Sequence, residues 1–149
     1  MATARLPQDF KEFLRLLDAR RVEYLLIGGH AVGYHGYPRA TKDLDVWVAA
    51  SPANAERLVR ALREFGFNAA DLSPALFCQE DRIVRMGVPP LQIEICTSIS
   101  GVSFSECFAA RVTETVDGVP VNIIGLDQLK TNKRASGRHR DLDDLEHLP

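Results

Sequence analysis

Residues 25–48 read LLIGGHAVGYHGYPRATKDLDVWV, and this stretch contains the pattern that decides the fold. It begins with an apolar run that ends at Gly28 and Gly29, as a buried strand does, and a short helix to about His35 follows. A loop with glycine and proline then leads to a second apolar strand at residues 44–49. The stretch therefore predicts a strand, a glycine turn, a helix and a second strand.

The rest of the chain alternates between helical and strand patterns, and two strand pairs flank turn signals typical of hairpins. Helices before, between and after several strands indicate an α/β (α+β) sheet domain. A chain of 149 residues fits one domain, residues 1–149. The predicted helices cover residues 7–21, 51–66, 104–110 and 126–148 with a break near Gly137, and the further strands cover residues 82–86, 91–96, 112–116 and 119–124.

Composition excludes several classes of protein. The net charge of −2 does not indicate general nucleic-acid binding, so any phosphate chemistry has to come from local charge. Three cysteines without close spacing argue against a disulfide framework and a zinc site, and favour free thiols in a reducing compartment. No signal peptide and no run of about 20 apolar residues is present, so we expect a cytoplasmic protein without a membrane span.

Two carboxylates on the second strand are the strongest chemical signal. Side chains alternate along a strand, so Asp43 and Asp45 share one face, with α-carbons about 6 to 7 Å apart. Two like charges side by side are costly unless a cation lies between them, and magnesium prefers such oxygen ligands together with substrate phosphates. The alternative is a turn-capping Asp43 and a solvent-facing Asp45, and the pair alone favours that alternative.

A third acid changes this balance. In residues 91–96, Leu91, Ile93 and Ile95 form an apolar face, and Glu94 lies on the other. If this strand lies beside the Asp43 strand, Glu94 joins the pair as a metal ligand or as the general base that deprotonates an attacking hydroxyl. The alternative is a solvent-facing glutamate on a half-exposed sheet.

The glycine pair precedes the acids by one helix. Gly28 and Gly29 allow a ligand close to the backbone, where free amide groups attract phosphate. His30 is a candidate contact to a phosphate or base, although a structural histidine is the more common case. Arg39 either holds a phosphate or pairs with an aspartate, and Lys42 is expected to be exposed.

Several motifs together resemble the nucleotidyltransferase superfamily of the polymerase-β type, most closely its small AbiEii-like and minimal-nucleotidyltransferase branches: Gly28-Gly29, Arg39, Asp43-Leu44-Asp45 and Glu94. The segment from Leu129 to Leu145 resembles the basic and acidic ending of AbiEii-like proteins. The resemblance covers most of the chain, from about Leu25 to Leu148. It departs from the family pattern at Gly29, where many relatives have serine, and at Glu94, where the third acid is often aspartate.

The resemblance implies a mixed sheet flanked by helices and a metal-dependent transfer of a nucleoside monophosphate from a nucleoside triphosphate to a hydroxyl. Asp43 and Asp45 would bind magnesium or manganese, and Glu94 would complete the acidic triad. Glycines 28 and 29 would cradle the triphosphate, and Lys133 would help to neutralise it. The acceptor would be RNA, a protein side chain or a small molecule.

A second hypothesis keeps the fold and removes the catalysis. The missing serine and the short chain favour a nucleotide-binding or antitoxin-like interaction module, with a partner protein of a toxin–antitoxin pair. A third, blander hypothesis is a structural sheet domain whose acids are incidental.

Overall fold

The computed structural model describes residues 6–88 and 91–149. Its strands are β1 (Tyr24–Ile27), β2 (Asp43–Val48), β3 (Ile83–Val88), β4 (Leu91–Cys96), β5 (Val112–Val116) and β6 (Val119–Ile123). Its helices are α1 (Gln8–Ala19), α2 (Gly28–Tyr34), α3 (Pro52–Phe65), α4 (Phe104–Ala109), α5 (Leu126–Ser136) and α6 (His139–His147), with a 3-10 helix, η1, at Pro74–Phe77. The predicted α+β class is therefore confirmed.

The described strands form one mixed sheet in the order β3-β4-β2-β1-β6-β5. β2 pairs with β4 in parallel and with β1 in antiparallel orientation, and β1 pairs with β6 in parallel. Both predicted hairpins, β3–β4 and β5–β6, are confirmed. The residues of the first hairpin turn, 89–90, lie outside the described part of the chain.

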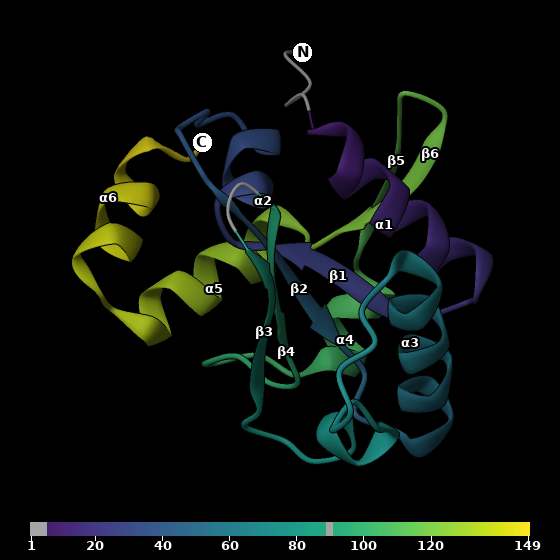
Figure 1. Cartoon of the computed structure of the whole chain (residues 1–149). Helices are drawn as coiled ribbons and strands as arrows, with labels where there is room; N and C mark the ends of the chain where they lie inside the picture. Colours follow the sequence, from purple (N-terminus) through teal and green to yellow (C-terminus); the bar gives the residue numbers. More distant parts are fainter. Residues whose placement is uncertain (1–5, 89–90) are drawn as a thin grey trace.

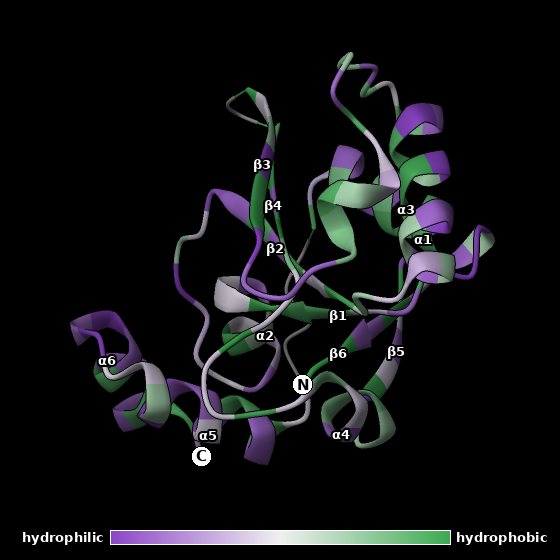
Figure 2. Ribbon diagram, turned by 90° about the horizontal axis from the view of Figure 1, so that it is seen from below, coloured by the Kyte–Doolittle hydropathy of each residue, from purple (hydrophilic) through white to green (hydrophobic). Residues whose placement is uncertain are grey.

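One face of the sheet holds the core, beneath α1 and α3 (Figure 1). Leu44, Val46 and Val48 of β2 are fully buried on this face. Both helices alternate hydrophobic and hydrophilic residues along their ribbons, as helices do that bury only one side (Figure 2). The alternation of β2 therefore turns Asp43, Asp45 and Trp47 to the opposite face.

The ends of α3 show that local signals in the sequence decide where this helix starts and stops. Ser51 caps it by accepting a hydrogen bond from the backbone amide of Asn54 at 3.2 Å. Gly66 ends it in the left-handed conformation, with φ of 117°. No helix in residues 6–88 and 91–149 has the length and apolar character that a membrane crossing requires.

Candidate active site

The structure places the three acids that the sequence suggested on two neighbouring strands. β2 and β4 pair in parallel, and their register places Asp45 opposite Glu94 and Asp43 opposite Gln92. Ile27, the last residue of β1, is the register partner of Asp45 on the other side. Three segments far apart in the sequence thus meet at one point of the sheet. The expectation that Glu94 lies beside the aspartate strand is confirmed.

Gly28 is required at this point because Asp45 packs directly against it. A Cβ atom on Gly28 would lie 2.1 Å from Oδ2 of Asp45 and 2.9 Å from its Cβ. Gly28 also has φ of 67°, a left-handed conformation that other residues rarely adopt. The glycine bend therefore fixes how closely the backbone approaches this carboxylate.

Gly29 has a different neighbour. A Cβ atom there would lie 2.6 Å from Oγ1 of Thr41 and 2.7 Å from its Cβ. The Thr41 hydroxyl, which donates to the backbone carbonyl of Asp43 at 3.3 Å, thus occupies the space that a serine side chain would need. At this position, where many relatives have serine, the hydroxyl beside the backbone is therefore that of Thr41, in the loop before β2.

The negative charges of Asp43 and Asp45 are not balanced by a cation among the described residues. Burial, with the charges of Glu94 and Asp43, raises the pKa of Asp45 to about 7, although the charges of Lys133 and Arg39 partly oppose these effects. Within the described part of the chain, neither aspartate carboxylate accepts a hydrogen bond or joins an ion pair. Asp45 is therefore a half-buried carboxylate in need of a cation.

The carboxylate of Glu94 is paired with an arginine of the neighbouring strand. Its Oε2 accepts a hydrogen bond from Nε of Arg85, its register partner on β3, at 2.9 Å. No three histidine, cysteine, aspartate or glutamate side chains among the described residues are grouped closely enough to hold a metal ion. The two aspartates still suit a magnesium ion, because both are unpaired oxygen ligands on one strand face.

The remaining predicted residues lie around this centre. Lys133 is buried and pairs with Asp141 and Asp144, at 3.1 Å each. Arg39 pairs with Asp144 through two hydrogen bonds of 2.9 and 3.2 Å, as one of its two expected roles required. His30 is buried, contacts the ring of Phe10 edge-on, and its Nε2 has no hydrogen-bond partner among the described residues.

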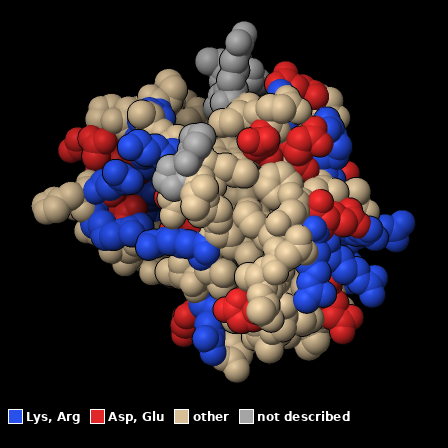
Figure 3. All heavy atoms as spheres, viewed as in Figure 1, with Lys and Arg blue, Asp and Glu red and all other residues tan. Residues whose placement is uncertain are grey.

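The pKa of His30 is lowered by burial and by the charge of Arg39, so the imidazole is favoured in its neutral form. Lys42, predicted to be exposed, is exposed. Lys and Arg side chains gather over α5 and α6, with a few acidic atoms between them (Figure 3). This local basic region is what a chain of net charge −2 needs beside a phosphate site.

Sequence reasoning did not single out Arg85 or Arg138. Arg138 is largely exposed, and its pKa is raised mainly by its hydrogen bond to Asp141 and by the charge of that residue, with smaller effects from Glu94 and Asp45. Arg85 has a usable signal, because continuing the predicted hairpin in register places it opposite Glu94. Arg138 lies in the basic part of the Leu129 to Leu145 segment that carries the resemblance, but the sequence did not favour it over the other basic residues there.

Comparisons with known proteins identify the family and the fold of this chain. The model of the aminoglycoside-2''-adenylyltransferase family matches residues 9–148. The Thermotoga maritima protein TM1012, assigned as a nucleotidyltransferase, superposes with a TM-score of 0.62 at 14% identity, covering 92% of this chain and 88% of that one. No curated protein sequence matches the chain.

A second solved structure, an antigenic nucleotidyltransferase-like protein from Paracoccidioides brasiliensis, has a TM-score of 0.53 at 15% identity and covers 97% of this chain and 77% of its own. Likeness at such low identity establishes the fold alone, and the fold and the family model together support nucleotidyl transfer in general. The finer AbiEii-like assignment stays a prediction. Since the family model spans nearly the whole sequence, the chain belongs to the aminoglycoside-2''-adenylyltransferase family.

Proposed function

We propose that this protein transfers a nucleoside monophosphate from a nucleoside triphosphate, bound with magnesium or manganese, to the hydroxyl of a small-molecule acceptor. The name of its family suggests adenosine triphosphate as donor and an aminoglycoside-type compound as acceptor. One observation carries the proposal: Asp45 is held between the Gly28 bend and Glu94, with a pKa of about 7 and no cation partner among the described residues.

Asp43 and Asp45 would hold the metal, which when bound offsets the charge that develops on the phosphates during transfer. Both carboxylates must be ionised for this role, and the cation itself favours ionisation of Asp45. Oε2 of Glu94 accepts the hydrogen bond from Arg85, so Oε1 is the oxygen that can serve this site while the pair stays formed. If Glu94 releases Arg85 instead, the guanidinium group becomes available to a phosphate oxygen.

In the proposed reaction, the acceptor hydroxyl oxygen forms a bond to the α-phosphorus, and the bond from that phosphorus to the bridging oxygen breaks. Pyrophosphate leaves with the electron pair of that bond, and Glu94 accepts the proton of the hydroxyl. In this proposal the backbone at Gly28 and Gly29, the Thr41 hydroxyl and the exposed Arg138 would orient the phosphates. Catalysis of this kind consists mainly of positioning and electrostatic stabilisation.

The second candidate function is a nucleotide-binding or antitoxin-like module without catalysis. The Arg85–Glu94 pair favours it, because Arg85 holds one oxygen of the side chain that would act as the base. The two candidates differ in one observable: the module binds nucleotide without releasing pyrophosphate.

The test uses radiolabelled adenosine triphosphate, magnesium and an aminoglycoside mixture, with pyrophosphate release and label transfer as readouts. We expect both in the wild type and neither in a protein carrying Asp43→Asn and Asp45→Asn. Asp71→Asn, on an exposed turn, is the matched control and should behave as the wild type. Transfer of equal size in the double variant would refute the assignment of these residues. Nucleotide binding without pyrophosphate release would support the module instead.

A further inference from the structure

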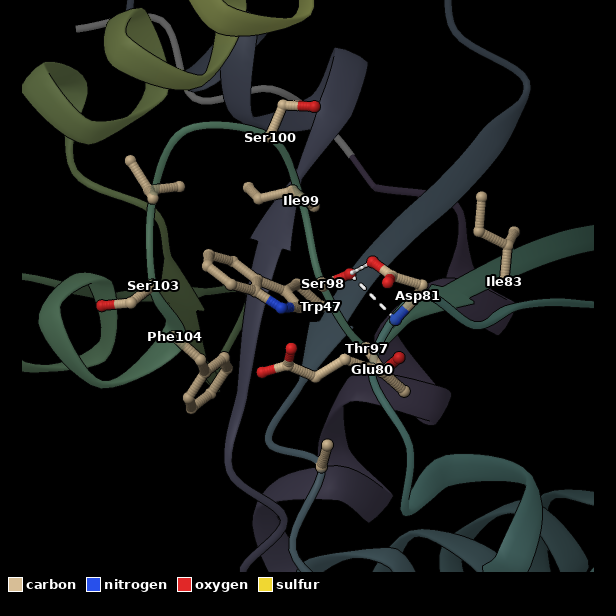
Figure 4. Close-up of a pocket in the computed structure, with 12 residues that line it drawn as sticks. Trp47, Glu80, Asp81, Ile83, Thr97, Ser98, Ile99, Ser100, Ser103 and Phe104 are labelled. Atoms are coloured by element: carbon tan, nitrogen blue, oxygen red, sulfur yellow. Dashed lines mark hydrogen bonds between the residues drawn. The ribbon is translucent and has the colours of Figure 1, made fainter.

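A hollow lies on the same sheet face as the carboxylates, toward the other end of β2 and β4. It has a volume of about 580 Å³ and lies between the end of β2, the loop before β3 and the segment that leads from β4 to α4 (Figure 4). The residues that matter for its chemistry are Trp47, Glu80, Asp81, Ser98 and Phe104. Trp47 follows Asp45 by two positions on β2, so their α-carbons are about 6 to 7 Å apart on one face.

The wall of this hollow contains an unsatisfied donor. The Trp47 side chain is 1% exposed, its ring meets Phe104 edge-on at 5.2 Å, and its Nε1 has no hydrogen-bond partner among the described residues. In Figure 4 the nitrogen side of the indole ring faces the part of the hollow where Ser98 and Glu80 lie. A buried N–H group without a partner costs free energy, which a ligand with an acceptor oxygen recovers.

The rim of the hollow is acidic and partly preorganised. The hydroxyl of Ser98 donates to Oδ1 of Asp81 at 2.8 Å and accepts from the Asp81 amide at 3.0 Å. The next amide, that of Arg82, donates to Oγ1 of Thr97 at 3.0 Å. Glu80, in contrast, makes no hydrogen bond or ion pair within the described residues, and its side chain extends toward the two aromatic rings in Figure 4.

The carboxylates of Glu80 and Asp81 and the N–H of Trp47 indicate which chemical groups a ligand of this hollow carries. Two carboxylates at the rim repel phosphates and therefore disfavour the nucleotide or an RNA acceptor here. An unpaired carboxylate calls for a protonated amine, and an unpaired indole N–H calls for a neutral oxygen such as a hydroxyl. A small molecule that carries both groups can satisfy the two at once.

We propose that this hollow is the acceptor pocket, and that it binds the amine-bearing end of a hydroxylated acceptor through Glu80, Asp81 and the N–H of Trp47. The role of this ligand as an acceptor rests on the proposed transferase function, but its binding in the hollow does not require catalysis. A molecule longer than the Asp45–Trp47 spacing can then present a hydroxyl toward the carboxylates while its amine stays in the pocket.

The test exploits the fact that Trp47 is the only tryptophan of the chain, so intrinsic fluorescence reports on this pocket alone. The probe is glucosamine, and glucose is the uncharged match. We expect a saturable fluorescence change with glucosamine and none with glucose at the same concentrations. Glu80→Gln should weaken glucosamine binding about tenfold, because a charge-assisted hydrogen bond is lost. Glu106→Gln, exposed on α4 and outside the lining, is the matched control and should leave the affinity unchanged.

Equal responses to the two sugars, or an unchanged affinity in Glu80→Gln, would overturn the proposal. Calorimetry on Trp47→Phe, which keeps an aromatic ring and removes the N–H, should show weaker glucosamine binding, and a cooperative melting transition at a lower temperature should show that the variant is folded. The Asp43→Asn and Asp45→Asn protein separates the two proposals. It should lose transfer and keep glucosamine binding. If only the pocket proposal is wrong, the wild type should still transfer the nucleotide, and Glu80→Gln should leave the rate of transfer unchanged.

Discussion

The chain contains two clusters of acids, and the fold treats them in opposite ways. In α6, Asp141 and Asp144 are buried against Lys133, with Arg39 and Arg138 at their edges. On β2, Asp43 and Asp45 have no ion-pair partner among the described residues. Acids that the fold pairs with its own cations stabilise the structure. Acids that the fold leaves unpaired are the ones available to a cation from outside.

The pKa values express the same contrast. Burial acts to raise the pKa of Asp141, but hydrogen bonds from Arg138 and Lys133 outweigh it and lower the value to about 2. Burial and like charges together raise the pKa of Asp45 to about 7. Each cluster can therefore be perturbed separately, and the following variants are ordered from the largest expected effect to the smallest.

Lys133→Met should break the paired cluster. The side chains of Asp141 and Asp144 are at most 1% exposed, so removing their shared cation leaves buried charge uncompensated and should lower the free energy of unfolding by about 3 to 5 kcal/mol. Urea unfolding measures this loss, and Arg134→Met, exposed on the same helix, is the control. A loss no greater than that of the control would show that the α6 acids do not depend on Lys133.

Gly28→Ala tests how tightly the unpaired cluster is built. Gly28 and Gly118 both have a left-handed backbone, so alanine at either should cost about 1 to 2 kcal/mol. Only at Gly28 does the added methyl group meet Asp45, whereas at Gly118 nothing lies within 4 Å. We expect Gly28→Ala to be the more destabilising by about 1 kcal/mol or more, and to weaken manganese binding. Equal losses in the two variants would mean that Asp45 moves aside freely.

The stability of the two clusters should respond oppositely to pH. Asp45 has a folded-state pKa above its ordinary value near 4, so ionisation costs stability as the pH rises from about 4 to about 7. Asp141 has a lowered pKa, so its contribution is present above about pH 4 and is lost as the pH falls toward 2.

Thermal unfolding at a series of pH values measures both effects. Asp45→Asn should gain stability over the wild type progressively between pH 4 and 7 and should leave the acid limb below pH 4 unchanged. Magnesium should raise the melting temperature of the wild type more at pH 8 than at pH 5, because it binds the ionised form. A constant difference between variant and wild type across this range would contradict the raised pKa.

Arg85→Met should have the smallest effect on stability and a selective effect on metal binding. Its pair with Glu94 is largely exposed on the arginine side, so its loss should change the free energy of unfolding by about 1 kcal/mol or less. Release of Glu94 should tighten manganese binding a fewfold, measured by calorimetry without nucleotide. Arg82→Met, exposed just before the same strand, is the control. Weaker manganese binding in Arg85→Met would assign Arg85 a supporting role instead.

The sequence alone determined those features that depend on neighbouring residues. Alternation along residues 43–48 decided which side chains face the core and which share the face of the acids. Ser51, Gly66 and the Asp117-Gly118 turn marked boundaries that the structure confirms, because caps and tight turns are satisfied by local hydrogen bonds and local backbone angles.

Only the tertiary structure decided what those faces meet. The parallel pairing of β2 with β4 put Glu94 beside Asp45, and the packing of α5 and α6 gave Lys133 to the buried acids rather than to solvent. The sequence placed Trp47 on the acid face but did not indicate that its N–H would be buried unpaired in the wall of a pocket. Contacts between distant segments depend on which strands become neighbours, and periodicity within one segment carries no information about that choice.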